Sequence, residues 1–304
     1  MHNLKRQWMV VFLLVFLGGG GAAAAQDFDK IPVQTVKLTE NVAMLIGGGG
    51  NIGVCVGPDG VLLIDDQFPQ LAEKIKTAIA GLNPGPMRIV FNTNWHYDHV
   101  YGNEWLAKAG AIIIAHENSR RSMLSEWGAP ELDAELKIPP YPEIALPKIT
   151  IKDSLTLYFN GEEIRVVHLP GAHSDGDLAF HFPLANVIQT GDIFFSAGFP
   201  FINISNGGTI DGMIEAAGKI LAMADADTKI IPGHGPLSNR EGLNAYRDML
   251  VAARERIAML IKEGRSLEDV LKANPVADLY KGKSDFPAEG FAKVVYLDLS
   301  RKKG

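Results

Sequence analysis

The sequence contains a single cysteine, Cys55, among its 304 residues. One thiol can form neither an intrachain disulfide nor a dithiol redox centre, and it excludes a metal site made of cysteines alone. Cys55 lies in the apolar run Ile52–Val56, which predicts a buried side chain. Any metal site in this chain must therefore be made of histidine and carboxylate ligands.

The chain also lacks an excess of positive charge. It has 29 Lys and Arg against 35 Asp and Glu, a formal net charge of −6. A surface that binds nucleic acid needs basic side chains to neutralise the phosphates, so we expect no nucleic acid partner. The 32 Gly and 17 Pro fall short of a fibrous or low-complexity composition, and 47% hydrophobic residues are enough for a full core.

Only the beginning of the chain has a long apolar run, Trp8–Leu17. Two basic residues precede this run, and glycines and an Ala-x-Ala step follow it, a pattern typical of a secretory signal peptide. The alternative is a membrane anchor, but ten apolar residues extend only about 15 Å as a helix, roughly half the hydrocarbon thickness. We predict that residues 1–25 are a cleaved signal peptide and that residues 26–304 form a single periplasmic or secreted domain, with no membrane attachment after cleavage.

Short β-rich runs and helical periodicities alternate along the rest of the chain. They predict strands over residues 33–38, 42–46, 52–56, 61–64, 87–91, 111–115, 149–151, 155–159, 164–169, 178–182, 187–189 and 229–231, and helices over 69–81, 103–109, 117–127, 209–224, 240–263 and 266–273. The second half repeats the plan of the first without a flexible linker. Two sheets with helices outside both are the natural packing of such a chain, an α/β architecture. The proline-rich stretch 128–148 predicts a long loop and a candidate lid.

Histidines and aspartates follow directly after several predicted strands. They are His96, Asp98 and His99 after strand 87–91, His173 after strand 164–169, Asp192 after strand 187–189, and His234 after strand 229–231. Loops at the same edge of a sheet converge on one cleft, so these side chains are expected to meet although they are far apart in sequence. Any one of them alone would more often be an ordinary hydrogen-bonded residue, but together they indicate a metal site.

The spacing in the first of these loops suggests two neighbouring metals. If Asn94–His99 is extended, the side chains alternate, so that His96 and Asp98 point one way and His99 the other. Zn²⁺ accepts neutral imidazole and carboxylate, and two zinc ions can share a bridging carboxylate, the role that suits Asp192.

The ordered motifs resemble those of the metallo-β-lactamase superfamily. They are Asn94-x-His96-x-Asp98-His99, Gly171-Ala172-His173, Thr190-Gly191-Asp192 and Pro232-Gly233-His234-Gly235, and the resemblance runs from about Val33 to the helix after His234. It implies a four-layered αββα sandwich with zinc at the sheet edges. It also implies that Asp65, at the end of strand 61–64, supports the metal loop from beneath.

One residue departs from the family pattern: the first motif position is usually His, and here it is Asn94. An amide oxygen is a poor zinc ligand, so the first site keeps only His96 and His173 as strong ligands. The second site is complete, with Asp98, His99, Asp192 and His234. We therefore expect one or two zinc ions, with the second site binding more tightly. If the first site is empty, His96 or Asp98 can act as the general base.

The same departure bears on the subclass that the chain resembles. One subclass of true metallo-β-lactamases also carries Asn at the first motif position, but it has Arg where His99 stands and Cys where Asp192 stands. An aspartate at that last position resembles glyoxalase II-like thioesterases, lactonases and other hydrolases of the superfamily.

The site predicts a zinc-dependent hydrolase in which a metal-bound hydroxide attacks the carbonyl of a small-molecule substrate. Export would place the enzyme where β-lactams act, which favours β-lactam ring opening. However, Phe195 stands where many of the family's β-lactamases have a lysine that grips the drug's carboxylate, so Ser196 and Asn203 would have to bind it as hydrogen-bond donors.

Two alternatives stay open beside β-lactam hydrolysis: a lactone, thioester or ester hydrolase, and an inactive ligand-binding member. The phenylalanines at 194, 195, 199 and 201 line an apolar substrate pocket or pack in the core. The oligomeric state is left open by the sequence.

Overall fold

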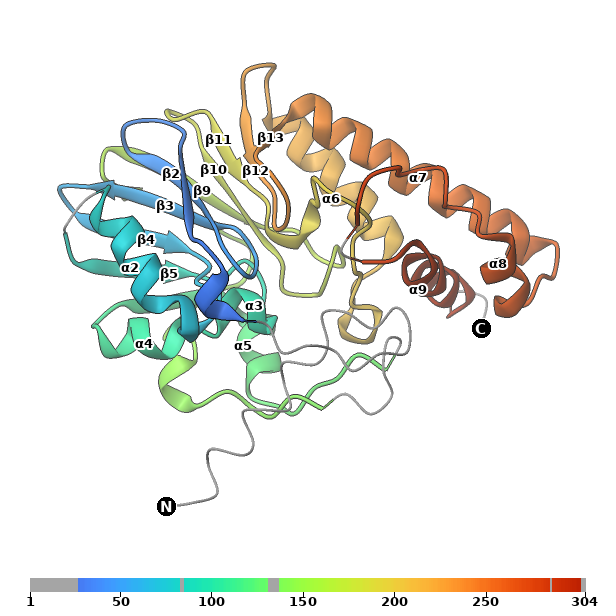
Figure 1. Cartoon of the computed structure of the whole chain (residues 1–304), viewed down its shortest axis with the longest axis horizontal. Coiled ribbons are helices and arrows are strands. Elements are labelled where there is room, and N and C mark those ends of the chain that lie inside the picture. The colour runs from blue at the N-terminus through green and yellow to red at the C-terminus, as the bar shows by residue number, and fades with distance from the viewer. Residues whose placement is uncertain (1–26, 83–84, 131–136, 285, 302–304) are drawn as a thin grey trace.

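The computed structural model describes residues 27–82, 85–130, 137–284 and 286–301. The predicted signal peptide, residues 1–25, and part of the predicted lid, residues 131–136, lie outside the described residues. Two β-sheets face each other and carry helices on their outer faces (Figure 1). The four-layered αββα arrangement is thereby confirmed.

The first sheet has seven strands in chain order. They are β1 (Gln34–Lys37), β2 (Val42–Ile46), β3 (Ile52–Gly57), β4 (Gly60–Ile64), β5 (Met87–Phe91), β6 (Ile112–His116) and β7 (Ile149–Ile151). Tight turns join β1 to β4, so these strands are antiparallel. Longer connections that contain helices join β4 to β7, so these strands are parallel and their carboxyl ends share one edge.

The second sheet has six strands, in the order β13-β12-β11-β10-β9-β8. Their bounds are β8 (Ser154–Phe159), β9 (Glu162–His168), β10 (Leu178–Phe182), β11 (Val187–Gln189), β12 (Lys229–Ile231) and β13 (Ser238–Asn239). Strand β10 runs antiparallel to both β9 and β11, and β12 is parallel to β11. The carboxyl ends of β9, β11 and β12 therefore point to the same edge, and the loops that follow them carry His173, Asp192 and His234.

The helices lie on the outer faces of the two sheets and beyond their edges. The α-helices are α2 (Ala72–Ala80), α3 (Tyr97–Val100), α4 (Asn103–Lys108), α5 (Glu117–Met123), α6 (Ile210–Met223), α7 (Arg240–Lys262), α8 (Leu267–Ala273) and α9 (Ala288–Arg301). Short 3₁₀ helices are η2 (Phe28–Lys30), η3 (Pro69–Leu71), η4 (Glu143–Ala145), η5 (Gly191–Ile193) and η6 (Ile204–Asn206). Helices α2 and α4 cover the first sheet and α6 and α7 the second (Figure 1).

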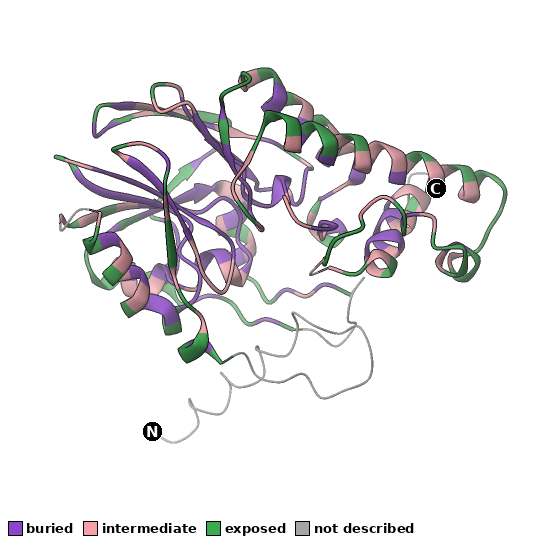
Figure 2. Cartoon of the chain, turned by 45° about the horizontal axis from the view of Figure 1, so that its top comes forward, coloured by how far each residue is buried: buried purple, intermediate pink, exposed green. Residues whose placement is uncertain are grey.

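Burial follows these layers. The strands are mostly buried, whereas the helices present mixed buried and exposed faces (Figure 2). Between the sheets, Phe91 of β5 meets Phe180 of β10 edge to face, with ring centroids 5.2 Å apart. This apolar layer fixes the distance between the two sheet edges that carry the metal-binding motifs.

Two helices differ from the sequence prediction. Helix α5 ends at Met123, not at 127, because the carbonyl of Met123 accepts a hydrogen bond from Tyr141 and Trp127 pairs with Ile138 as a β-bridge. Helix α9 was not predicted. The buried face of α9 includes Asp298, whose carboxylate accepts a hydrogen bond from the backbone N–H of Ile210 at the start of α6. This polar residue interrupts the apolar periodicity by which a helix is predicted.

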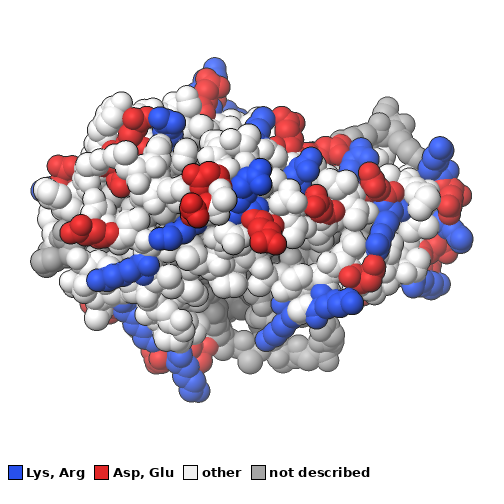
Figure 3. Space-filling view, turned by 90° about the horizontal axis from the view of Figure 1, so that it is seen from above, with Lys and Arg blue, Asp and Glu red and all other residues white. Residues whose placement is uncertain are grey.

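Within the described ranges, we find no helix with the length and apolar character needed to cross a membrane. On the face shown in Figure 3, Lys and Arg are interspersed with Asp and Glu. This face therefore offers no continuous basic patch for a nucleic acid.

Replacing Phe180 by Ala should lower the free energy of unfolding by about 3–5 kcal/mol, because it opens a cavity between the sheets where the ring is fully buried. Tyr158→Ala is the control: Tyr158 is 75% exposed on β8, and its loss should change stability by less than about 0.5 kcal/mol. Urea unfolding followed by circular dichroism measures both. Similar losses in the two variants would contradict this account of the core.

Candidate metal centre

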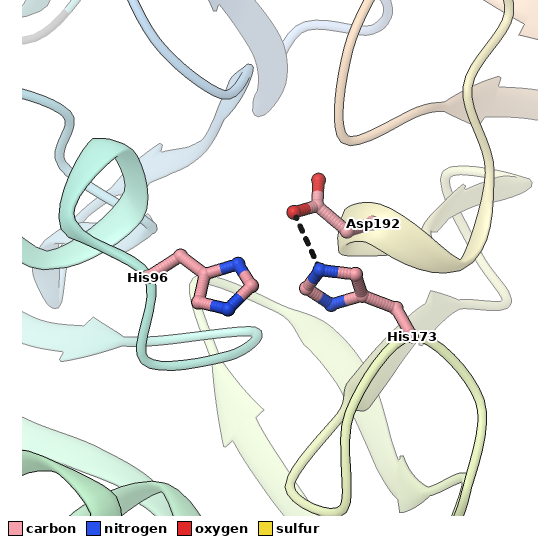
Figure 4. A group of neighbouring side chains, drawn as sticks. All are labelled: His96, His173 and Asp192. Carbon is pink, nitrogen blue, oxygen red and sulfur yellow. Dashed lines mark ion pairs between the residues drawn. The ribbon is translucent and has the colours of Figure 1, made fainter. Parts of the chain in front are cut away.

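The structure brings the sequence-predicted ligands together in two groups at the sheet edges. In each group, one potential ligand atom per residue lies within 4.8 Å of the others: His96, His173 and Asp192 form one group, and Asp98, His99 and His234 form the other. Figure 4 shows the first group converging from three separate segments, of which the one that carries Asp192 is the 3₁₀ helix η5.

Asp192 lies between the two groups. Its Oδ2 is 3.5 Å from Nε2 of His173, and its Oδ1 is 3.2 Å from Nε2 of His99 and 3.3 Å from Nε2 of His234. The two carboxylate oxygens thus point to different groups, the placement that a bridging carboxylate requires.

The loop that carries the first motif is not extended throughout, and the prediction of alternating side chains over residues 94–99 was wrong. His96 is extended, but Tyr97–Val100 forms the helical turn α3, in which His99 N–H donates to the carbonyl of His96. In this turn the side chains of Asp98 and His99 both face the cleft. The two residues therefore belong to the same ligand group, together with His234. Periodicity could not predict this turn because a four-residue turn is too short to show one.

Glycines let a neighbouring loop pack directly on this motif. A Cβ on Gly50 would lie 2.2 Å from Cε1 of His99, and one on Gly49 would lie 2.6 Å from the carbonyl oxygen of Asp98. The Gly50 N–H donates to that carbonyl at 3.2 Å. The close approach of the two loops thus requires glycine at both positions.

Carboxylates hold two of the imidazoles from behind. Oδ2 of Asp65 accepts from Nδ1 of His99 at 2.8 Å and from the Thr93 hydroxyl at 2.8 Å. Oδ1 of Asp177 lies 3.2 Å from Nδ1 of His173. With the proton on Nδ1, each ring turns the lone pair of Nε2 toward the centre, as in carboxylate–histidine–metal triads. The structure thus places Asp65 where it was predicted.

The atoms that face the centre fit a divalent cation. His99 Nε2, His173 Nε2 and Asp192 Oδ1 are buried and have no hydrogen-bond partner, although His99 Nε2 and Asp192 Oδ1 are only 3.2 Å apart. Lone pairs that converge without the alignment of a hydrogen bond are the arrangement expected around a metal. Imidazole nitrogens and carboxylate oxygens are also the donors that zinc accepts.

The electrostatics of the centre favour positive charge among its carboxylates. Burial opposes the ionisation of Asp192 and Asp98, but the surrounding imidazoles lower the pKa of Asp98 to about 2 and hold that of Asp192 well below its usual value. Burial likewise opposes protonation of His99, yet the neighbouring carboxylates raise its pKa well above the ordinary value. By contrast, burial and the nearby His173 lower the pKa of His96 to about 3.

Asn94 does not turn its oxygen toward the ligands. Its Oδ1 accepts the backbone N–H of His96 at 2.8 Å, and its Nδ2 donates to Oδ2 of Asp192 at 3.3 Å. The amide therefore orients the Asp192 carboxylate and the motif loop. That Asn94 is a weak or absent metal ligand stays a prediction.

The predicted substrate contacts divide between the cleft and the interior. The ring of Phe195 stacks on His234 with centroids 5.0 Å apart, and the ring of Phe201 is 6.0 Å from His96. Both rings are partly exposed, whereas Phe194 and Phe199 are buried in the core under α6, α7 and α9. Only two of the four phenylalanines thus border the site.

The two polar residues predicted to bind substrate, Ser196 and Asn203, form hydrogen bonds within the protein. The Ser196 hydroxyl donates to the carbonyl of Pro236 at 2.6 Å. Asn203 is fully buried, with its side-chain amide 2.8 Å from Nε2 of His96, so it supports a histidine and does not reach a substrate.

Two residues at the centre were not predicted from the sequence. Asp177 lies four residues after His173, and an acidic residue at that distance in a tight loop was the available signal. Trp127 stacks on His96 with centroids 5.3 Å apart, a contact across 31 positions that no local pattern indicates.

The described parts of the predicted lid, residues 128–130 and 137–148, pack beside this aromatic cluster. The Tyr141 hydroxyl donates to the carbonyl of Trp95 at 3.0 Å, and both side chains are buried. Movement of this segment stays a prediction.

The fold and these two ligand groups define a metal-dependent hydrolase. The sequence model of the metallo-beta-lactamase superfamily matches residues 45–237, more than half of the chain. The chain therefore belongs to this superfamily, as the motifs predicted.

Curated relatives include hydroxyacylglutathione hydrolases. The enzyme of Pelagibacter ubique (strain HTCC1062) is 30% identical over 149 residues, which is 49% of this chain and 52% of the relative. That of Brucella anthropi is 31% identical over 146 residues, 48% of this chain and 46% of the relative. The chain thus matches about half the length of these relatives.

Solved structures support the fold alone, because their sequence identities are low. A metallo-beta-lactamase from Pontibacter korlensis has a TM-score of 0.58 at 15% identity, over 72% of this chain and 99% of the other. The sec-alkylsulfatase Pisa1 from Pseudomonas sp. has a TM-score of 0.66 at 15% identity, over 95% of this chain and 54% of the other.

Asn94→His should tighten zinc binding at the His96–His173–Asp192 group by about 10-fold or more, because it adds an imidazole where an amide now faces Asp192. Calorimetric titration combined with metal analysis should show the zinc content rising toward two per chain. Asn244→His, on the exposed face of α7, is the control and should leave zinc binding unchanged. An unaltered stoichiometry in Asn94→His would refute this assignment.

Proposed function

We propose that this protein is a zinc-dependent hydrolase of uncharged or weakly charged acyl substrates, with thioesters and esters as the main class. The observation that carries the proposal is the buried carboxylate of Asp192 between two groups of imidazole and carboxylate ligands. The superfamily membership supports a hydrolase, and the unpartnered atoms at the centre support a metal.

A zinc ion would bind most firmly at the group made of Asp98, His99, His234 and Asp192. In this group Nε2 of His234 lies 3.2 Å from Oδ2 of Asp98 and 3.3 Å from Oδ1 of Asp192. When bound, zinc would polarise a carbonyl oxygen and lower the pKa of water, the two effects that acyl hydrolysis at neutral pH requires. Asp65 keeps His99 in the tautomer that such binding needs.

Among the carboxylates of the centre, Asp98 is the one that a substrate can reach. Its side chain is 18% exposed, against 4% for Asp192, and its Oδ2 lies 3.2 Å from Nε2 of His234. We assign the Asp98 carboxylate the role of accepting the proton of the attacking water through the oxygen that does not hold the metal, because this side chain combines access with a position fixed by an imidazole.

The walls of the site favour an acyl substrate without a strong negative charge. Aromatic rings of Phe195 and Phe201 lie beside His234 and His96, and aromatic surface binds apolar groups. The relatives named hydroxyacylglutathione hydrolases support the thioester class, because an acyl group carried by the sulfur of glutathione is a thioester.

β-Lactam hydrolysis is the second candidate. The predicted export of the chain, from the pattern of residues 1–25, would bring it to the compartment where β-lactams act. Against it, Phe195 presents an apolar ring beside His234 where a cation would grip the carboxylate of the drug.

The protein from residue 26 onward, loaded with zinc, should hydrolyse S-acylglutathione thioesters, aryl esters and lactones faster than a penicillin, a cephalosporin or a carbapenem. A chelator should reduce the rate by at least about 100-fold, and zinc should restore it. Turnover of the lactams alone would favour the second candidate. Bound zinc without turnover of any of these compounds would instead favour the inactive ligand-binding alternative.

Asp98→Asn should reduce kcat by about 100-fold or more, because an amide cannot take the proton of the attacking water. Asp248→Asn, an exposed site on α7, is the matched control and should keep full activity. Rates are measured with the best substrate of the panel at saturating zinc, and thermal melting checks that both variants fold. An active Asp98→Asn enzyme would remove Asp98 from the mechanism.

A further inference from the structure

The imidazoles of the centre are supported in two different ways. His99 and His173 each direct Nδ1 at a carboxylate, of Asp65 and of Asp177 respectively. His96 instead directs its Nε2 at an amide, that of Asn203, at 2.8 Å. An ionised carboxylate can only accept a hydrogen bond, whereas an amide accepts one through its oxygen or donates one through its NH₂ group. The orientation of the Asn203 amide therefore decides which nitrogen of His96 carries the proton.

The neighbours of Asn203 fix this orientation. Its Oδ1 accepts both the backbone N–H and the side-chain Nδ2 of Asn206, at 3.2 and 3.0 Å, and thereby caps helix η6. A flipped amide would point its NH₂ group at these two donors. The Asn206 N–H also donates to the backbone carbonyl of Asn203 at 3.1 Å, so the two side-chain bonds set this orientation: the oxygen faces Asn206, and the NH₂ group faces His96.

The backbone holds Asn203 in place as firmly as its side chain does. Its N–H donates to the carbonyl of His173 at 2.8 Å, and its carbonyl accepts from Gly208 at 2.9 Å. A Cβ on Gly208 would lie 2.2 Å from the His173 carbonyl oxygen, so the loop fits closely against that residue. Asn203 is fully buried and thus connects both histidines of one ligand group.

This arrangement has a consequence for the proton of His96. Because Nε2 accepts from Asn203, the single proton of the neutral ring is on Nδ1. In Figure 4 the ring nitrogen of His96 beside the attachment carbon, Nδ1, lies on the side of Asp192. The other ring nitrogen, Nε2, is the one bonded to Asn203. An N–H group faces the position where a metal would need a lone pair.

We propose that Asn203 is a positioning residue that keeps His96 in its Nδ1–H tautomer, so that the His96–His173–Asp192 group binds zinc weakly and the Asp98–His99–His234 group takes the first metal. This effect is separate from the missing first-motif histidine, because it acts through a ligand that is present. The inference rests on the proposed metal centre but not on any particular substrate.

Asn203→Asp tests the proposal with a nearly isosteric change. One carboxylate oxygen can still accept the Asn206 N–H, and Asp is as good an N-cap as Asn, so η6 should be kept. The other oxygen now accepts from Nε2 of His96, which moves the ring proton to Nε2 and frees the Nδ1 lone pair. The second zinc should then bind about 10- to 100-fold more tightly than in the unaltered protein.

Ser205→Asp is the matched control, because it adds the same charge to the same 3₁₀ helix at an exposed position. Zinc titration of the protein from residue 26 onward should show one tight and one weak site in the unaltered protein and in Ser205→Asp, and two tight sites in Asn203→Asp. Two equally tight sites in the unaltered protein, or an equal gain in the control, would overturn the proposal.

Nitrogen-15 NMR of histidine-labelled protein reads the tautomer directly and needs neither activity nor the variant. With one equivalent of zinc, His96 should carry its proton on Nδ1, and in Asn203→Asp on Nε2. A proton on Nε2 of His96 in the unaltered protein would refute the inference. Failure to bind any zinc would instead sink the proposed function, while the NMR tautomer would still decide the role of Asn203.

Discussion

A buried carboxylate surrounded by imidazoles is the constraint on which the site depends. Asp192 is nearly inaccessible, and an isolated carboxylate in that environment would lose most of its hydration energy. Positive charge at His99, His173 and His234, whether from protons or from a bound metal, offsets this cost from three directions. The two sheets must therefore meet with their carboxyl-terminal edges aligned, because those imidazoles come from both sheets.

The residues behind the ligands make the centre asymmetric. A neutral imidazole has one proton, and its outer partner decides which nitrogen carries it. Asp65 and Asp177 direct lone pairs of two rings inward, while Asn203 directs an N–H of His96 inward by our inference. By the same inference, the two ligand groups differ in their affinity for a metal.

The wall of the site depends on the end of the chain. Arg301 of α9 donates to the carbonyl of Ile204 at 2.9 Å, and the Ser284 hydroxyl accepts the N–H of Phe199 at 2.9 Å. These contacts hold the segment that carries Phe201 and Asn203. A helix that has no part in the chemistry therefore shapes both the apolar wall and the support of His96.

The sheets, most helices and the candidate ligands could be predicted from the sequence alone, because strand patterns are local and each motif follows directly after a strand. The sequence could not predict the helical turn Tyr97–Val100, which phenylalanines border the site, or which residue forms a hydrogen bond with His96. The contact between Asn203 and His96 joins residues 107 positions apart, and its geometry exists only when both sheets are packed. Tertiary structure decided these features because the direction of a hydrogen bond depends on every neighbour of both partners, and those neighbours come from distant parts of the chain.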